Sequence, residues 1–416
     1  MPHRRHHRQE EVLSDTMTLT PRTFVCVAAA LASVRVAKRM LMSRFFNGEQ
    51  YPITKMTPEP FTHTLVDLTV SALASKRVYE PPESFFEGRD SITGKDAISR
   101  ARFLECAPAT GEDAEAYAWL VPWSSFRKSV ISTEFEIQQD EERERDGENG
   151  SSALTLYVVF RGTESREDML TNLDLFTEEF FSKSAKEDGN EHHDGEVDQP
   201  YVHSGFLDQF RALEPRITEY LSKHGTSCSR VVFAGHSLGG ALATIATLYY
   251  ATRQFRFRNF PSLPFIYCHT FGSPRVGDEA FCAAFERYVH HLEKNDGYGD
   301  GHESTRVHHW RVFDYEDPVP MVPISCRFTH VMKNTLCIGD RLRSRVCRTR
   351  DTHWCKRPIC GFFRIDLFDP IGAHDCDRYF GRLSSLVRWR SKGQASVSVP
   401  GNVGGSRYSV SRHPLK

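Results

Sequence analysis

Short runs of β-branched and aromatic residues alternate along the chain with longer segments whose apolar positions recur at helical spacing. The runs predict strands at residues 116–121, 129–137, 154–160, 231–234, 264–271 and 307–313. The longer segments predict helices at residues 61–75, from 206 to about 223, at 238–250, from about 279, and at 372–386. This alternation predicts an α/β fold, a mostly parallel central sheet with helices on both faces. Ligands of such a sheet bind at the carboxyl ends of its strands.

The sharpest local signal lies in residues 229–250, where a short apolar strand is followed at once by an Ala- and Leu-rich helix. The pentapeptide GHSLG, with Ser237 at its centre, occupies the turn between them. A strand that turns directly into a helix strains its central residue, and glycines on either side give the turn room. The pattern predicts that the Ser237 hydroxyl projects above the sheet as a nucleophile. A Gly-rich turn with an ordinary surface serine is the less favoured alternative.

A serine hydroxyl needs a base to become a nucleophile at neutral pH, and the base needs a carboxylate that fixes its tautomer. On an α/β-hydrolase sheet the three residues follow in the order serine, acid, histidine. Asp317 comes just after the strand predicted at 307–313 and is our predicted acid. Asp278 precedes a helix and is better suited to an N-cap, and Asp314 lies close to the body of the strand.

The candidates for the base, His330, His353 and His374, follow Asp317 in the sequence. His374 lies where the chain enters the last predicted helix, a suitable place for a mobile base, so we predict it as the catalytic histidine. His330 follows the Pro-rich turn too closely to swing back and ranks second. His236, beside the nucleophile, is expected to point into the fold and to pack in the core.

Attack on a carbonyl creates an oxyanion that needs two hydrogen-bond donors. The N–H of Leu238, the residue after the nucleophile, is predicted as the first donor. The second should come from the end of another strand, where the tripeptide Arg161-Gly162-Thr163 follows the apolar run at 154–160. Thr163 offers its N–H and its hydroxyl, and an ordinary turn is the alternative interpretation of this tripeptide.

Taken together, these segments resemble the class 3 lipases, the fungal-lipase branch of the α/β-hydrolase superfamily. The matching motifs are FRGTES (160–165), VHSGF (202–206), GHSLGGALA (235–243), FGSPRVGD (271–278), DPVPMVP (317–323) and HDCDRYF (374–380). Over roughly residues 60 to 390 the resemblance implies an α/β-hydrolase fold that hydrolyses lipid esters. It implies the triad Ser237, Asp317 and His374, and Thr163 as oxyanion residue. It also implies a lid near residues 164–173, although Met169 follows Asp168 where such families usually carry an aromatic residue.

The domain organisation follows from the polar segments between the predicted elements. Residues 1–58 are predicted as an N-terminal extension, 59–391 as one hydrolase domain, and 392–416 as a Gly/Ser-rich disordered tail. Polar insertions are expected at about 138–152, 182–200, 292–306 and 340–360. Within the extension, residues 17–46 contain no acidic residue, which leaves three interpretations open: a signal peptide, a mitochondrial transit peptide or a docked amphipathic helix.

Charge and cysteine usage exclude several classes of function. The formal net charge of −1 predicts no nucleic-acid partner, and no apolar run approaches the ~18 residues of a membrane span. The 11 cysteines form no small-scaffold pattern and are expected to be reduced thiols. Those at 337, 347, 355 and 360, with His353, lack the paired spacing of a zinc site, so neither metal nor cofactor is expected.

Two functions remain. The favoured one is a soluble or peripheral enzyme that cleaves carboxylic esters of acylglycerols or phospholipids, because nucleophile, acid, base and oxyanion residues are all present. The alternative is a catalytically weak lipase-fold scaffold or lipid sensor. Residues 340–360 carry seven Arg and Lys residues in a chain whose other insertions are acidic, which favours docking on an anionic membrane or lipid droplet. Pairing of these residues with the acidic insertions is the competing interpretation.

Overall fold

The structure is a computed structural model. It describes residues 50–52, 58–79, 102–106, 114–122, 154–162, 176–181, 199–253, 265–288, 307–314, 316–323, 325, 327–331, 334–339, 344–347 and 372–395. All of these belong to one compact unit, Gly48–Lys416. The targeting segment at 17–46, the strand at 129–137, the lid at 164–173, most of the polar insertions and Thr163 lie outside the described residues.

A nine-stranded sheet, in the order β1-β11-β10-β9-β8-β7-β4-β3-β2, forms the centre of the described residues. Its five middle strands are parallel to one another: β4 (Leu154–Phe160), β7 (Cys228–His236), β8 (Phe265–Phe271), β9 (Val307–Asp314) and β10 (Thr335–Ile338). Antiparallel strands flank them, with β3 (Ala114–Pro122) and β2 (Arg102–Cys106) at one edge and β11 (Arg345–Cys347) and β1 (Gln50–Pro52) at the other. The predicted mostly parallel sheet is confirmed.

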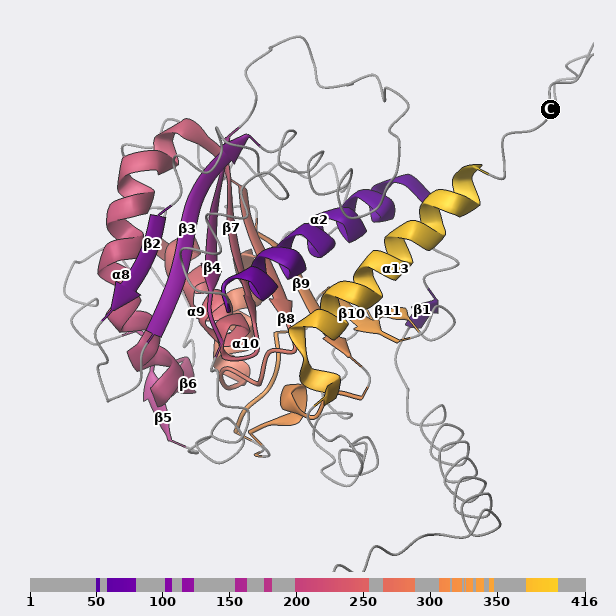
Figure 1. Ribbon diagram of the computed structural model, residues 1–416. Helices are drawn as coiled ribbons and strands as arrows, with labels where there is room; N and C mark the ends of the chain where they lie inside the picture. The colour runs from indigo at the N-terminus through magenta and orange to yellow at the C-terminus, as the bar shows by residue number, and fades with distance from the viewer. Residues whose placement is uncertain are drawn as a thin grey trace, which may run out of the picture. The chain divides into compact units, whose positions relative to one another are not determined.

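Helices cover both faces of this sheet (Figure 1). One face packs against α8 (Ser204–His224), α9 (Leu238–Arg253) and α10 (Glu279–Tyr288), and the other packs against α2 (Pro58–Arg77) and α13 (Cys376–Ala395). In β4, Leu156 and Val158 belong to the first core, whereas Tyr157 and Val159 belong to the second. Burial on both faces explains why these strands appear in the sequence as continuous apolar runs.

The helices α2 and α13 lie side by side across one face of the sheet (Figure 1). Cys376, at the start of α13, is buried against α2 and directs its thiol toward the carbonyl of Ala72. Lys76, in the last turn of α2, pairs with Asp377 at 2.5 Å. The packing of these two helices fixes the point at which the chain enters α13, immediately after His374.

Four boundaries differ from the sequence predictions. The segment predicted as an insertion at 340–360 contributes strand β11, and Gln50–Pro52 in the predicted extension pairs with it as β1. The helix predicted from 372 begins as a 3-10 turn, η6 (Gly372–His374), and α13 then continues to Ala395, past the predicted start of the tail. The edge strands β1 and β11 are held by backbone pairing, and η6 is a helical turn of a different pitch. Neither feature produces a recognisable spacing of apolar residues in the sequence.

Candidate active site

Ser237 lies in a strained turn between β7 and α9. Among the described residues, Ser237 is the one non-glycine residue with a positive φ, which is 58°. The residue is buried, with 2% of its surface exposed. A Cβ at Gly235 would overlap the backbone of Gly239, and a Cβ at Gly239 would overlap the carbonyl of Phe160. The two glycines therefore allow the chain to fold back on itself against the end of β4. The predicted strained turn at Ser237 is confirmed.

The backbone around Ser237 is fixed by hydrogen bonds to the neighbouring strand. The Ser237 N–H donates to the carbonyl of Phe271 at 2.9 Å. Leu238 is the first residue of α9, and the first N–H groups of a helix have no acceptor within the helix. Gly162, at the end of β4, lies so close that a Cβ there would be 3.2 Å from the Ser237 Cβ. The residue after it, Thr163, is not among those described.

His374 and Asp317 form a buried hydrogen-bonded pair, although they are 57 residues apart in the sequence. The His374 Nδ1–H donates to Asp317 Oδ2 at 2.8 Å, and the two side chains are 6% and 0% exposed. Because a carboxylate only accepts, the shared proton belongs to Nδ1, and a neutral ring then presents Nε2 as an acceptor. This Nε2 makes no hydrogen bond with any described residue. The pair thus has the tautomer that a general base requires.

The pair lies beside the turn that carries Ser237. A Cβ at Gly272, which has a φ of +59°, would lie 2.8 Å from Asp317 Oδ2 and 3.1 Å from His374 Cε1. Gly272 follows Phe271, whose carbonyl accepts the hydrogen bond from the Ser237 N–H. One peptide unit therefore contacts the serine backbone on one side and the acid and histidine on the other. The fold gathers all three residues at the carboxyl ends of β7, β8 and β9.

The rival acids have other roles in the structure. The Asp278 Oδ1 accepts a hydrogen bond from the Phe281 N–H at 2.7 Å, which confirms the predicted N-cap of α10. Asp314, at the end of β9, is fully buried and forms ion pairs with Arg378 and Arg382. Neither carboxylate is shown in contact with a histidine.

The rival histidines are equally unsuited to the role of base. The His330 Nε2–H donates to the carbonyl of Pro320 at 2.5 Å. Burial, together with the charges of Arg311 and Arg275, holds the pKa of His330 well below its usual range. A histidine that must stay neutral in this way stabilises an imidazolium ion poorly. His353 lies outside the described residues.

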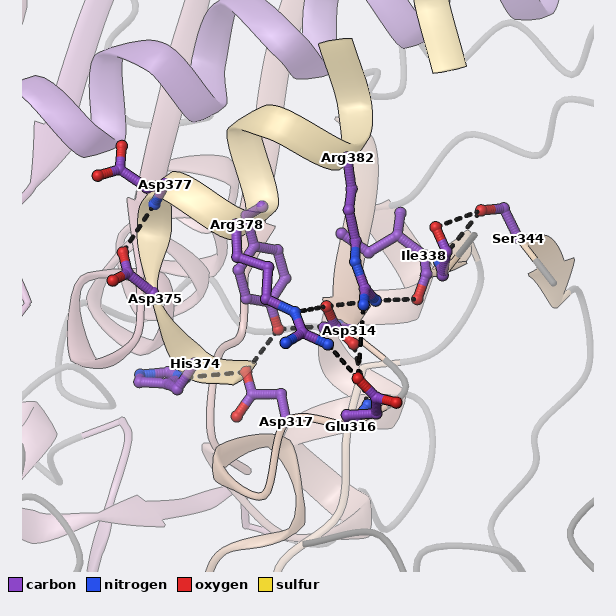
Figure 2. A network of polar contacts seen from close by, with 12 residues as sticks. Asp314, Glu316, Asp317, Ile338, Ser344, His374, Asp375, Asp377, Arg378 and Arg382 are labelled. Carbon is purple, nitrogen blue, oxygen red and sulfur yellow. Dashed lines mark hydrogen bonds and ion pairs between the residues drawn. The ribbon is translucent and has the colours of Figure 1, made fainter. Parts of the chain in front are cut away.

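A network of polar contacts on α13 holds Asp317 in place (Figure 2). Tyr379 donates its hydroxyl to Asp317 Oδ2 at 2.5 Å and accepts from the Asp314 N–H at 2.9 Å. Burial and the charge of Asp317 raise the pKa of Tyr379 well above its usual value, so the hydroxyl remains a donor. The Val319 N–H donates to Asp317 Oδ1 at 2.8 Å. Both carboxylate oxygens are therefore oriented by fixed donors.

Two arginines of α13 compensate the buried charge of Asp314 beside this network. Arg378 Nε lies 2.9 Å and Arg382 Nη1 lies 2.5 Å from Asp314 Oδ2, and both arginines also pair with Glu316 (Figure 2). Burial raises the pKa of Asp314, and Arg382 and Arg378 oppose that rise. The sequence analysis missed Tyr379 and both arginines. Arg378 and Tyr379 lie within the HDCDRYF motif (374–380), and Arg382 lies one turn further along the same helix, which are the sequence signals that could have indicated them.

The remaining expectations concern metals, thiols and membranes. Among the described residues, no group of three or more His, Cys, Asp and Glu side chains could hold a metal ion. Cys337, one of the residues considered for a zinc site, is buried and forms no disulfide within the described part of the chain, and the same holds for Cys228, Cys268, Cys282 and Cys376. Within the same part of the chain, we find no helix with the length and apolar character needed to cross a membrane.

Known proteins similar to this chain were found by family, by sequence and by structure. Residues 157–326 match the family described as Lipase (class 3). The secreted mono- and diacylglycerol lipase 2 of Gibberella zeae is 29% identical over 223 residues, which cover 48% of this chain and 51% of that protein. Phospholipase A(1) DAD1, chloroplastic, of Arabidopsis thaliana is 25% identical over 214 residues, covering 50% and 42%. Among solved structures, lipase II from Rhizopus niveus has a TM-score of 0.45 at 22% identity, covering 75% of this chain and 93% of that one. The chain thus spans about half the length of the curated relatives it matches.

Proposed function

Because the chain belongs to the class 3 lipase family of the α/β-hydrolase superfamily, we propose that it is a serine hydrolase that cleaves carboxylic ester bonds of lipids. The observation that carries the proposal is the buried His374–Asp317 pair beside the strained turn at Ser237. The substrate class is an acylglycerol or a phospholipid, in line with the names of the two curated relatives.

In the proposed mechanism, the His374 Nε2 removes the proton of the Ser237 hydroxyl as its oxygen attacks the acyl carbonyl carbon. The tetrahedral intermediate collapses, the bond to the leaving alcohol breaks, and His374 delivers the proton to that alcohol. Water then attacks the acyl-enzyme by the same sequence of proton transfers and releases the fatty acid. Asp317 stabilises the imidazolium and holds its ring, while Tyr379 and the Val319 N–H hold Asp317. These steps use protein groups and water.

The oxyanion of each tetrahedral intermediate is proposed to bind the Leu238 N–H and Thr163. Leu238 begins α9, so its N–H points out of the helix at the positive end of the helix dipole. Thr163 follows Gly162, which lies against Ser237.

Thr163→Val tests the contribution of the threonine hydroxyl, because valine keeps the shape and the backbone N–H. We expect kcat for a short-chain ester to fall on the order of 10- to 1,000-fold with KM little changed, the pattern for a lost oxyanion donor. Thr163→Ser, which restores the hydroxyl, should recover most of kcat. A change confined to KM in the valine variant would instead make Thr163 a substrate-binding residue.

The proposed function is tested on a panel of tri-, di- and monoacylglycerols and phospholipids, with released fatty acid as the readout. Wild-type protein should release fatty acid from at least one class, and Ser237→Ala should release none above background. The alternative function, a lipase-fold scaffold or lipid sensor, predicts binding of lipid without release. If the wild-type protein hydrolyses neither a lipid of the panel nor a short-chain ester, the proposal is overturned.

We further propose that residues 340–360 dock the enzyme on an anionic lipid surface. Each basic residue near such a surface contributes about 1 kcal/mol, and salt screens the attraction. Liposome co-sedimentation should therefore rise with phosphatidylserine content and fall with salt. Changing Arg341, Arg343 and Arg345 to Gln should weaken binding, whereas changing Arg216 and Lys223, exposed on α8, to Gln should not. Equal binding to neutral and anionic liposomes at low salt would contradict docking by charge.

A further inference from the structure

His236, the last residue of β7 and the neighbour of Ser237, uses both ring nitrogens in polar contacts. Its Nε2 lies 2.7 Å from the backbone oxygen of His374, and its Nδ1 lies 3.0 Å from the hydroxyl of Tyr79. The ring is buried, as the sequence predicted, and it lies 4.5 Å from the His374 ring, centroid to centroid. Packing alone requires no such directed contacts. The residue before the nucleophile is thus joined to the backbone of the candidate base.

The chemistry of these contacts fixes the direction of each hydrogen bond. The carbonyl of His374 can only accept, so the proton on the His236 ring belongs to Nε2. With one ring proton, Nδ1 accepts, and Tyr79 must donate its hydroxyl. Burial raises the pKa of Tyr79 far above its usual value, so that hydroxyl keeps its proton. The chain of donors therefore runs from Tyr79 through His236 to the backbone of His374.

Tyr79 comes from the end of α2, the helix that packs against α13. Its N–H donates to the carbonyl of Lys76 at 3.2 Å, which holds it in a turn just beyond the helix. The Tyr79 hydroxyl also lies against Gly162, where a Cβ would overlap it. Tyr79 thus contacts the end of β4 one residue before Thr163, in addition to His236.

From this geometry we propose that Tyr79 and His236 are positioning residues for ester hydrolysis, an inference that rests on the function proposed above. Asp317 holds the His374 ring at Nδ1, and His236 holds the His374 backbone. Two fixed points on one residue restrict the swing of Nε2 relative to Ser237. In enzymes, a displacement of about 1 Å at a reacting group costs on the order of 100-fold in rate.

Two substitutions at His236 separate a hydrogen-bonding role from packing. Glutamine carries its amide nitrogen near the position of Nε2, so His236→Gln can still donate to the His374 carbonyl. Asparagine is shorter and reaches only the position of Nδ1, so His236→Asn leaves that buried carbonyl without its donor. With a soluble short-chain ester, we expect kcat to fall about 10- to 100-fold for Asn and to stay within about 5-fold of wild type for Gln. KM should stay within about 2-fold in both.

Tyr79→Phe provides an independent test, because it keeps the ring and removes only the hydroxyl. We expect a fall in kcat of about 3- to 10-fold with KM unchanged, and little further loss when it is combined with His236→Asn, since both act through one chain of hydrogen bonds. Tyr249→Phe is the matched control. It removes a hydroxyl that donates to Glu214 on α8 at 2.8 Å, far along α9 from Ser237, and should leave kcat unchanged.

The outcomes distinguish this inference from the proposed function. If wild-type protein hydrolyses esters but Asn and Gln at residue 236 give equal kcat, or Tyr79→Phe matches Tyr249→Phe, the positioning role is wrong and the hydrolase remains. If wild-type protein neither hydrolyses esters nor reacts with a fluorophosphonate, the proposed function is wrong and the positioning role falls with it. Should His236→Asn show no cooperative thermal unfolding, the Tyr79→Phe result decides alone.

Discussion

Replacing Ser237 with alanine is expected to lower kcat for a short-chain ester on the order of 10⁴- to 10⁶-fold while leaving the protein folded. The serine oxygen is the proposed attacking atom, and only substrate binding and the oxyanion donors act without it. The fold should survive because alanine keeps the backbone N–H that donates to Phe271 and meets the same φ of 58° that serine tolerates. Steady-state kinetics and a thermal unfolding curve measure the two expectations.

Ser229→Ala is the matched control for this substitution. Ser229 lies at the other end of β7, where its hydroxyl donates to the carbonyl of Leu154 at 3.4 Å. Loss of that hydroxyl should leave kcat within about 2-fold of wild type, in the range of a surface substitution remote from the site. Hydrolysis by the Ser237→Ala protein near the wild-type rate would show that another residue is the nucleophile.

Removing the base should be as damaging as removing the nucleophile. His374→Ala is expected to lower kcat on the order of 10⁴- to 10⁶-fold, and the double variant with Ser237→Ala should be little worse, because residues that act as a unit are non-additive. The measurement is kcat for the two single variants and the double variant on one ester. If His330→Ala abolishes activity and His374→Ala is mild, the assignment of the base is wrong.

The acid can be tested with a nearly isosteric change, Asp317→Asn, for which we expect a loss in kcat of about 10⁴-fold. In the wild type, Oδ2 accepts from both Tyr379 and His374 while Oδ1 accepts from the Val319 N–H. An amide has one oxygen and one NH₂ group, so it cannot accept on both sides. At least one of the three wild-type donors, from Tyr379, His374 or Val319, would then face the NH₂ group of the asparagine. The histidine also loses the negative charge that fixes its tautomer. A kcat near that of wild type would remove Asp317 from the mechanism.

The sequence predicted those parts of the site that depend on local structure. The turn at Ser237 follows from a strand, two glycines and a helix that are neighbours in the chain, and Asp278 as an N-cap follows from the helix after it. The pairing of His374 with Asp317 was predicted from chain order, without any local pattern that links the two residues. Their contact depends on α13 packing against α2, which sequence periodicity does not specify.

The roles of Tyr79 and Tyr379 do not follow from local sequence patterns, because each contributes a single hydroxyl to a contact made by tertiary packing. Tyr79 follows an apolar helix and Tyr379 lies in one, and a buried tyrosine at such positions is usually a core residue. The edge strands β1 and β11 were missed for a related reason. Residues 345–347 lie in an Arg- and Cys-rich segment that suggests a loop, yet their backbone pairs with β10 and β1. These two strands are held in the sheet by main-chain hydrogen bonds, and their sequences carry no alternating apolar pattern.

The central claim, that Ser237 is an activated nucleophile, is tested most directly by covalent labelling of the 416-residue protein with a fluorophosphonate. The account predicts one adduct, mapped by mass spectrometry to Ser237, with labelling nearly abolished in His374→Ala and unchanged in Ser229→Ala. A protein that hydrolyses lipid esters but carries the adduct on another residue, or that labels at Ser237 equally well without His374, would contradict it.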